Sequence, residues 1–324
     1  MEKNRKNHLL KLSKEFALLA VESITVRINE SLSIEVDQPI YKNINNITRQ
    51  IDDQTQFLYH TYFRREFGNA IIFAGEEVND HRKYSDAYKK DKFVASIDAV
   101  DGTDLVAKGF YNWCTAMFFF IPDDHVFGAI VGTPSSKITR NLAGEMKQIP
   151  SGVIYYADEE KAYKSEPNID GEFSEIILTI PEENRNKDLK EASICFYGQK
   201  AGNFLSLAQK GNFLTRLESF AAEAKYQKID FRLYNFGGNP MIVKIMEGCV
   251  DAVLELKGQK SYDVLPGAFI AQRAGAFWGD LQGNPINNTY LKEKGFLSDP
   301  EKKLSYIIAA SKKLYDELIE LLCP

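Results

Sequence analysis

Apolar residues recur at helical spacing through the first part of the chain. Residues 8–30 and 48–67 each place apolar side chains three or four positions apart, which predicts two amphipathic helices. Two short apolar runs follow, at 70–73 and 93–97, and each ends at acidic residues. These runs predict two strands that carry carboxylates at their ends.

Between about residue 113 and residue 200 the pattern changes to short β-rich runs separated by turn residues. The pattern predicts strands at 113–121, 125–131, 152–157, 175–180 and 191–197. The stretches 139–150 and 165–174 lack such a pattern, and we expect them to be exposed loops.

Beyond residue 200 the periodicity alternates between helix and strand. It predicts strands at 250–256 and 305–310, and helices at 202–210, 218–228, 239–247, 264–274 and 311–322. This order of elements favours a layered α/β fold. We expect one unit over 1–324, with a metal- and phosphate-binding half at 1–200 and a C-terminal half at 201–324 that completes the site.

Composition excludes several classes of protein. The chain has 324 residues, a net charge of −5 and only four histidines, which are scattered. An acidic chain has no general attraction for nucleic acid, and a metal in this sequence would need oxygen ligands. The four cysteines lack zinc-like spacing. We find no signal peptide and no run long enough to span a membrane, so the expected location is the cytoplasm.

The strongest chemical signal is the segment 98–103, which reads Asp-Ala-Val-Asp-Gly-Thr directly after an apolar strand. A turn here can point Asp98 and Asp101 at one place while exposing the amides of Gly102 and Thr103. Carboxylates beside free amides suit a Mg²⁺ ion that bridges to a phosphate. A solvated polar turn is the alternative, since Asp-Gly is common in hairpins.

Two further acidic residues, Glu76 and Asp263, are candidate metal ligands, but each taken alone also has a simple structural explanation. Glu76 follows Gly75 at the end of the run at 70–73, and an isolated glutamate there would usually be a solvated loop residue. Asp263 precedes an apolar helix, where an acid commonly caps the first amides.

Together these motifs resemble the inositol monophosphatase superfamily of metal-dependent, often lithium-sensitive phosphatases. That family carries Gly-Glu-Glu, then Asp-Pro-Ile-Asp-Gly-Thr, then Trp-Asp-x-x-Ala-Gly, and this chain has Gly-Glu-Glu at 75–77, the segment at 98–103 and Tyr-Asp-Val-Leu-Pro-Gly at 262–267. The resemblance spans about 10–320. It implies an αβαβα sandwich, hydrolysis of a small phosphate monoester such as an inositol or sugar phosphate, and a homodimer.

The resemblance also implies the ligands of two or three Mg²⁺ ions. Glu76, Asp98 and the carbonyl of Val100 would bind one ion. Asp98, Asp101 and Asp263 would bind a second, and a third would be held loosely near Glu76.

The remaining catalytic roles fall on the same segments. Gly102 and Thr103 would bind the phosphate through their amides, and the Thr103 hydroxyl would orient the attacking water. Two metal ions can activate a water and clamp the reacting oxygens, while Glu76 orients that water or accepts its proton.

Two departures from the family pattern affect the surroundings of these residues. The family acid that assists the threonine lies in Val-Thr-x-x-Asp, whereas here Asp52 and Asp53 fall later after Thr48. The proline between the first two acids is Ala99 here.

The substrate side departs more strongly. Gly238 and Asn239 occupy the place of a substrate-binding motif, and Glu255 lies near the position of a glutamate that contacts inositol. The alternative for Gly238 and Asn239 is a turn that caps the following helix. Three basic residues are candidates for a second phosphate, although solvated charge is the simpler interpretation: Arg232, Lys257 and Lys260.

The sequence therefore leaves the substrate open. The alternatives are a fructose-1,6-bisphosphatase or a nucleotide 3'-phosphatase of the same superfamily, a catalytically inactive phosphate-binding member, and a structural protein whose acids only cap helices and turns.

Overall fold

The structure is a computed structural model that describes most of the chain in two compact units, Met1–Ile177 and Leu178–Pro324. The sequence analysis placed the boundary between its two halves at 200/201 instead. The described residues are 2–32, 40–76, 93–106, 108, 110–122, 124–140, 146–167, 172–223, 229–299 and 301–322.

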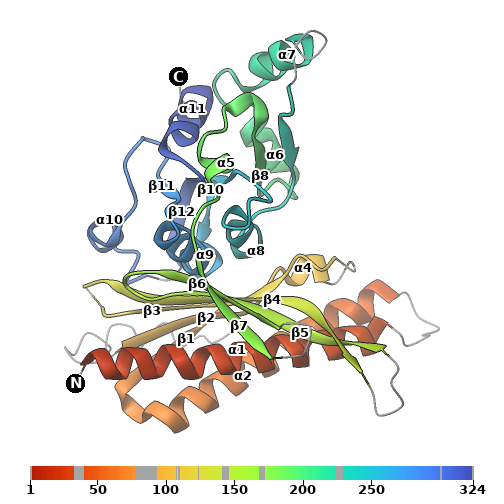
Figure 1. Cartoon of the computed structure of the whole chain (residues 1–324), viewed down its shortest axis with the longest axis vertical. Coiled ribbons are helices and arrows are strands. Elements are labelled where there is room, and N and C mark those ends of the chain that lie inside the picture. The colour runs from red at the N-terminus through yellow and green to blue at the C-terminus, as the bar shows by residue number, and fades with distance from the viewer. Residues whose placement is uncertain are drawn as a thin grey trace. The chain divides into compact units, whose positions relative to one another are not determined.

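The first unit contains two long helices and a seven-stranded sheet (Figure 1). Strand order follows chain order from β1 to β7. The β1–β2 pair is parallel, and each neighbouring pair from β2 to β6 is antiparallel. The elements are α1 (Glu2–Leu32), α2 (Ile40–Phe67), the 3-10 turn η1 (Gly68–Ala70), β1 (Ile71–Gly75), β2 (Phe93–Asp101), α4 (Thr103–Val106), β3 (Cys114–Phe120), β4 (Val126–Arg140), β5 (Met146–Ala157), β6 (Ala162–Pro167) and β7 (Phe173–Leu178).

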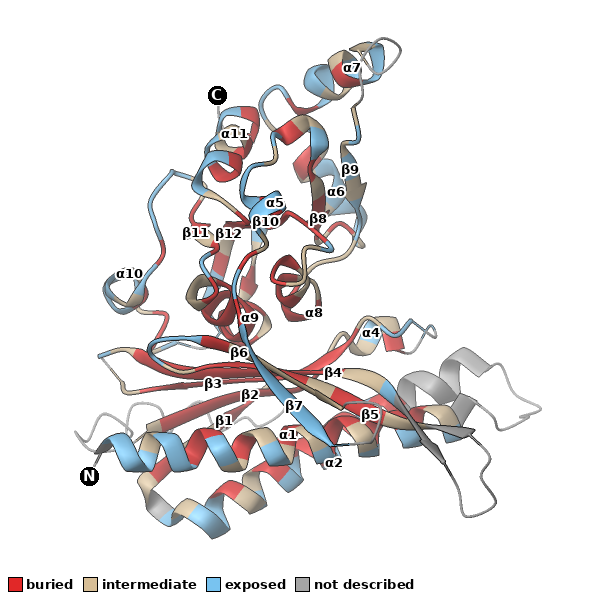
Figure 2. Cartoon of the chain, in the orientation of Figure 1, coloured by how far each residue is buried: buried red, intermediate tan, exposed pale blue. Residues whose placement is uncertain are grey.

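The helix α1 lies close against the sheet because glycines in β4 leave room for its side chains. Leu10 packs over Gly128, where a Cβ atom would lie 2.6 Å from Leu10 Cδ2. Val21 packs over Gly132 in the same way, with a Cβ distance of 2.9 Å. The buried residues of α1 follow its helical period along one side, and its other side is exposed (Figure 2). This confirms the two predicted amphipathic helices.

The strand β3 is apolar at every position except Thr115. All seven of its residues, Cys114–Phe120, are buried. A strand whose residues are all buried has no polar alternation, which explains the continuous apolar run at 113–121.

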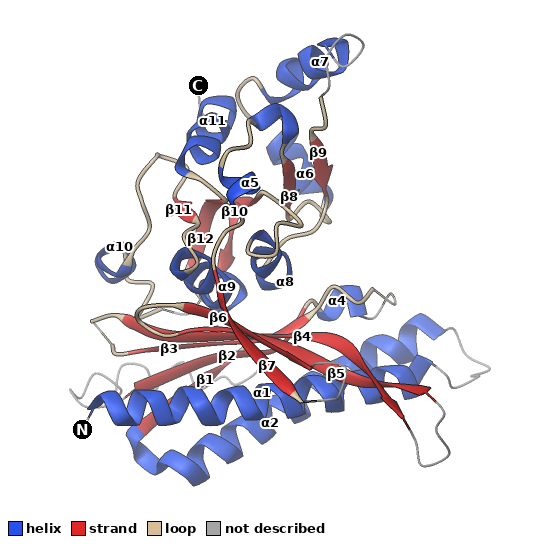
Figure 3. Cartoon of the chain, in the orientation of Figure 1, coloured by secondary structure: helices blue, strands red, loops and turns tan. Residues whose placement is uncertain are grey.

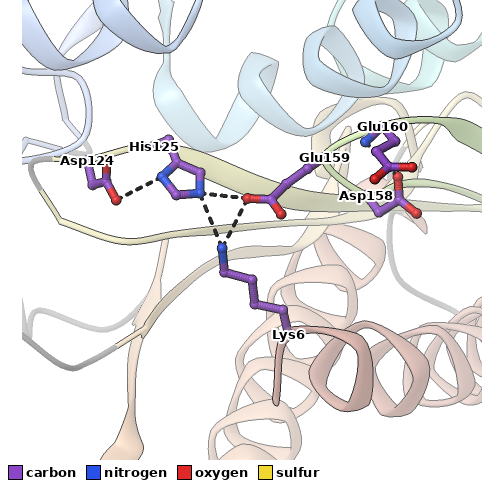
Figure 4. Close-up of polar contacts among 6 residues, drawn as sticks. All are labelled: Lys6, Asp124, His125, Asp158, Glu159 and Glu160. Atoms are coloured by element: carbon purple, nitrogen blue, oxygen red, sulfur yellow. Dashed lines mark hydrogen bonds and ion pairs between the residues drawn. The ribbon is translucent and has the colours of Figure 1, made fainter. Parts of the chain in front are cut away.

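A polar cluster connects the start of α1 with two turns of the sheet (Figure 4). His125 has its Nδ1 atom 2.9 Å from Asp124 Oδ2 and its Nε2 atom 2.7 Å from Glu159 Oε1. Lys6 Nζ donates to Glu159 Oε1 over 3.0 Å. The Lys6 side chain is 11% exposed, so this ion pair is partly screened from solvent.

The second unit is built on a five-stranded sheet of order β11-β12-β10-β8-β9. The strands β8, β9 and β10 are parallel, and β12 runs antiparallel to β10 and β11. The elements are α5 (Glu182–Arg185), η3 (Leu189–Glu191), β8 (Ser193–Phe196), α6 (Ala201–Ala208), α7 (Phe213–Glu223), β9 (Arg232–Tyr234), α8 (Asn239–Ile242), η4 (Val243–Ile245), β10 (Ala252–Lys260), α9 (Ser261–Arg273), β11 (Phe277–Gly279), α10 (Asn288–Glu293), β12 (Lys303–Ala309) and α11 (Lys312–Leu322).

The structure corrects both predicted loops. Most of the described part of 139–150 belongs to β4 and β5, which pair from Ala129↔Ala157 out to Arg140↔Met146. Residues 165–167 end β6, and β7 begins at Phe173 (Figure 3). The outer part of the β4–β5 pair carries polar residues and Pro150, and a strand without an apolar face has no period-2 signal.

None of the helices within the described ranges is both long and apolar enough to cross a membrane.

Candidate metal and phosphate site

The strand β2 contains a β-bulge between the two aspartates of the segment 98–103. Asp98 pairs with Ala116 and Asp101 pairs with Cys114, so three steps along β2 match two steps along β3. Side chains alternate between faces along a regular strand, and residues three apart point in opposite directions. An extra residue changes this alternation and allows both carboxylates to share one face, which is how bulges direct side chains near active sites.

Parallel pairing of β1 with β2 brings Glu76 next to Asp98. Gly75 is in register with Ile97, and the amide of Glu76 donates to the Ile97 carbonyl over 3.1 Å. Carboxylate oxygens of Glu76 and Asp98 lie within 4.8 Å of each other. Two carboxylates this close repel unless a proton or a cation lies between them. Their all-oxygen donor set fits Mg²⁺, which is the ion expected from the sequence.

Asp98 is the more enclosed of the two aspartates. It is 2% exposed, and its Oδ1 atom accepts a hydrogen bond from the amide of Val100 over 3.1 Å. Asp101 is half-buried, and the thiol of Cys114 lies 3.8 Å from its Oδ2 atom. The structure thus holds both side chains in place through contacts within the same unit.

The turn after Asp101 requires glycine. Gly102 has φ 102°, and a Cβ atom there would lie 2.8 Å from the Asn112 carbonyl oxygen. Its own carbonyl accepts hydrogen bonds from Leu105 and Val106, which begins the short helix α4 at Thr103. The amides of Gly102 and Thr103 therefore belong to a tight strand-to-helix turn beside the carboxylates, as the phosphate-binding prediction needs.

A row of buried polar side chains on α2 supports the same region. Thr48, Asp52 and Gln56 recur every four residues and are at most 5% exposed, whereas Asp53 is exposed. Gln56 packs directly on Gly75, where a Cβ atom would lie 2.3 Å from Gln56 Cδ. Of the two acids left open by the sequence, Asp52 is the one on the inward face. The sequence analysis missed Gln56, although a polar row at i, i+4 on an otherwise amphipathic helix was a usable signal.

In the second unit, Asp263 is the third residue of α9. The helix begins at Ser261, and its N-cap position is Lys260, which makes no side-chain capping hydrogen bond. Asp263 is therefore not the capping residue of this helix. A carboxylate in the first turn of a helix is stabilised by the helix dipole. The Asp263 side chain is half-buried.

The side chains of the predicted substrate motif make contacts inside the second unit. Asn239 is fully buried, donates to the Tyr262 carbonyl over 2.9 Å and accepts from the Gly267 amide over 2.8 Å. Gly238 has φ 75° and is the N-cap of α8. These contacts fix the start of α8 against α9.

Glu255 is also inside the second unit. It is 3% exposed and accepts from the Lys257 amide over 2.7 Å. Burial raises the pKa of this carboxyl, and hydrogen bonds from nearby backbone amides oppose that rise.

The three basic candidates for a second phosphate differ in their surroundings. Lys260 pairs with Glu301 over 2.9 Å, and exposed Arg232 pairs with Asp230 over 2.8 Å. Lys257 forms no ion pair with any residue that the structure describes, and its Nζ atom lies 2.9 Å from the position a Cβ would take on Gly202. Lys257 thus places an ammonium group at the first turn of a helix, α6, and its charge also acts on the nearby Glu255 carboxylate.

The sequence profile of the inositol monophosphatase family matches residues 5–319. The chain belongs to the inositol monophosphatase family. It is thus a phosphoric monoester hydrolase of a family whose members depend on metal ions, which confirms the resemblance seen in the motifs and the layered α/β fold.

Known relatives agree with this assignment. A protein of Archaeoglobus fulgidus described as fructose-1,6-bisphosphatase/inositol-1-monophosphatase is 25% identical over 235 residues, covering 72% of this chain and 70% of that protein. Inositol monophosphatase II from Staphylococcus aureus MSSA476 has a similar fold, with a TM-score of 0.60 and 18% identity over 96% of this chain and 95% of that one. An IMPase/NADP phosphatase complexed with Mg²⁺ and phosphate has a TM-score of 0.54 and 16% identity, over 84% of this chain and 80% of that chain.

Proposed function

We propose that the protein is a Mg²⁺-dependent phosphatase for a small phosphorylated polyol, such as an inositol or sugar monophosphate. The observation that carries this proposal is the Glu76–Asp98 carboxylate pair beside the bulge that redirects Asp101. Bound Mg²⁺ would supply positive charge for the phosphate and lower the pKa of a water. The IMPase/NADP phosphatase that has this fold is itself described with Mg²⁺ and phosphate.

Within this proposal each residue has a defined task. Glu76, Asp98 and Asp101 would hold the cations together with the Val100 carbonyl, and Asp263 would be a further ligand, as the family resemblance implies. Two or three ions would be bound, as the family resemblance implies.

The remaining tasks concern the phosphate and the water. The amides of Gly102 and Thr103 donate to phosphate oxygens, and the Thr103 hydroxyl orients the attacking water while Asp52 accepts from that hydroxyl. Glu76 accepts the proton of the water as it attacks. No covalent intermediate with the chain is required.

The first test is phosphate release from a panel of inositol, hexose and nucleotide phosphates, with Mg²⁺ and with chelator. We expect Asp98→Asn and Asp263→Asn to lower kcat/KM at least about a hundredfold, since a bound metal contributes several kcal/mol to catalysis. Asp104→Asn is the matched control, because Asp104 is an exposed neighbour in α4 with no assigned task. Wild-type turnover in Asp98→Asn, with its fold checked by circular dichroism, would refute the proposal.

The pair Asp52 and Asp53 offers a second matched comparison. Asp52→Asn should lower kcat because it removes the acceptor for Thr103, whereas Asp53→Asn should leave kcat unchanged, since Asp53 is exposed. Equal effects of the two substitutions would contradict the role of Asp52.

A bisphosphate substrate is the second candidate, and the position of the Lys257 ammonium group beside the first turn of α6 favours it. Helix amides and a nearby cation together attract an anion. Lys257→Gln should then raise KM for a hexose bisphosphate about tenfold, the effect of one charge-assisted hydrogen bond, without changing KM for a monophosphate. Lys210→Gln, just beyond the other end of α6, is the control. No selective change in KM would exclude this candidate.

We further propose by family resemblance that the protein is a homodimer and is inhibited by Li⁺. Sedimentation analysis tests the first point, and phosphate release at increasing LiCl, with NaCl as the control, tests the second. A monomer at micromolar concentration or equal effects of the two salts would contradict the respective point.

A further inference from the structure

Cys114 places a thiol next to one of the carboxylates of the candidate site. It is the first residue of β3 and lies opposite Asp101 in the register of β2 and β3. The thiol is buried, and its Sγ atom is 3.8 Å from Asp101 Oδ2. A thiol is a weak hydrogen-bond donor and an ionised carboxylate only accepts, so the thiol donates to Asp101.

The backbone around Cys114 holds this contact in place. A Cβ atom on Gly102 would lie 2.8 Å from the Asn112 carbonyl oxygen and 3.2 Å from Trp113 Cα. The turn that follows Asp101 is therefore packed against the two residues that precede Cys114. Trp113 itself is 1% exposed, so the backbone that leads into Cys114 is enclosed.

We propose that Cys114 is a positioning residue for metal binding: its thiol donates to Oδ2 of Asp101 and fixes the orientation in which that carboxylate meets the cation. This inference rests on the proposed function, in which Asp101 is a metal ligand. Carboxylate ligands of metals are commonly oriented by such hydrogen bonds, and their loss typically lowers metal affinity about 10–100-fold. A thiol is a weaker donor than those in most such cases, so we expect an effect of roughly three- to tenfold.

The chain contains a matched control for this thiol. Cys195 is likewise a fully buried cysteine within a strand, β8, but it belongs to the second unit. Its burial raises the pKa of its thiol to about 12. Replacing Cys195 removes a buried thiol of the same kind without touching a candidate ligand.

The test is a calorimetric titration of the full-length protein with Mg²⁺, which needs no turnover. Cys114→Val, which has similar volume and no donor, should raise the Mg²⁺ dissociation constant roughly three- to tenfold. Cys114→Ser, which keeps a donor, should stay within about twofold of wild type, and Cys195→Val should not differ from wild type. At saturating Mg²⁺ we expect kcat of Cys114→Val to return to the wild-type value, because the ligand itself is still present.

A spectroscopic readout tests the contact directly. The S–H stretching band that is lost in Cys114→Val should lie at lower frequency than the band lost in Cys195→Val, because hydrogen bonding weakens the S–H bond. Asp101→Asn should shift the Cys114 band upward.

The outcomes separate the two hypotheses. Wild-type protein that binds no Mg²⁺ would overturn the proposed function, and the positioning role with it. Wild-type protein that binds Mg²⁺ while Cys114→Val binds equally tightly would overturn the positioning role alone. Equal weakening in Cys114→Val and Cys195→Val would also overturn it, because the effect would then be a general one of losing a buried thiol.

Discussion

Replacing Asp251 by asparagine should destabilise the second unit strongly, because three donors converge on this buried carboxylate. Asp251 is fully buried, and Asn184 Nδ2 donates to its Oδ1 over 2.6 Å. Lys187 Nζ lies 3.1 Å from both oxygens, and the Ser193 amide donates to Oδ2 over 2.8 Å. An asparagine has one acceptor oxygen and one NH₂ group, so whichever way it faces, the NH₂ group meets another donor.

The expected loss of stability in Asp251→Asn follows from the burial of the Lys187–Asp251 ion pair. Breaking a buried ion pair by removing one partner costs about 3–5 kcal/mol. The Lys187 side chain is 29% exposed and can turn its charge towards water, so we expect the lower end, about 3 kcal/mol. With an m-value of about 2 kcal/mol per M urea, the unfolding midpoint would fall by roughly 1.5 M.

The two tryptophans allow each unit to be followed separately. Trp113 is buried in the first unit and Trp278 in the second. In a Trp113→Phe background, fluorescence in urea reports on the second unit, and the Asp251→Asn substitution should lower that midpoint. The control is Asp316→Asn, which breaks only the exposed Lys312–Asp316 pair on α11 and should change stability by less than about 0.5 kcal/mol. A midpoint for Asp251→Asn equal to that of the control would refute the reasoning.

The remaining predictions concern pH, the phosphate turn and the metal. Burial alone would raise the pKa of Glu159, but hydrogen bonds from Lys6 and His125 outweigh it and lower that pKa from 4.5. The Lys6–Glu159 ion pair therefore stabilises the fold above about pH 4.5. This contribution is lost as the pH falls through the lowered pKa. Lys6→Met should lower the free energy of unfolding by at most about 1 kcal/mol at neutral pH. A difference in urea midpoint from wild type that does not shrink as the pH is lowered below 4.5 would contradict this origin. Gly102→Ala should lower the free energy of unfolding by about 1–3 kcal/mol, because it adds a Cβ atom at φ 102° against the Asn112 carbonyl. An unchanged melting temperature together with unchanged phosphate release would contradict this prediction. Mg²⁺ at about 100 times its dissociation constant should stabilise the wild-type protein by about 2.7 kcal/mol, and a melting temperature insensitive to Mg²⁺ would argue against the metal site.

Sequence periodicity predicted elements where burial is one-sided or complete. The helices at 8–30 and 48–67 correspond to α1 and α2, and the apolar run at 113–121 corresponds to β3. Prediction failed where the sequence of a strand is mainly polar, as in β6 (Ala162–Pro167) and in the outer parts of β4 and β5. Short elements such as β9 and β11, of three residues each, contain less than one repeat of any useful pattern.

The sequence by itself determined which chemical groups are available and where they stand relative to each element. Glu76 directly follows β1, Asp98 and Asp101 lie in the last four residues of β2, and Asp263 lies in the first turn of α9. Local patterns predicted these places, except that they ended the second strand before Asp98. The identity of side chains and the ends of apolar runs are local properties, so a single sequence contains them.

Only the tertiary structure decided how these groups meet. The parallel pairing of β1 with β2 sets Glu76 beside Asp98, and the bulge opposite β3 redirects Asp101 towards Cys114. Packing of α2 turns Asp52 inward and leaves Asp53 in solvent. Each of these depends on strand register or helix packing between residues far apart in the chain, and a shift of one residue would reverse the direction of every side chain along a strand. Local sequence patterns contain no information about strand register, because the register depends on how two strands that are distant in the chain are buried together.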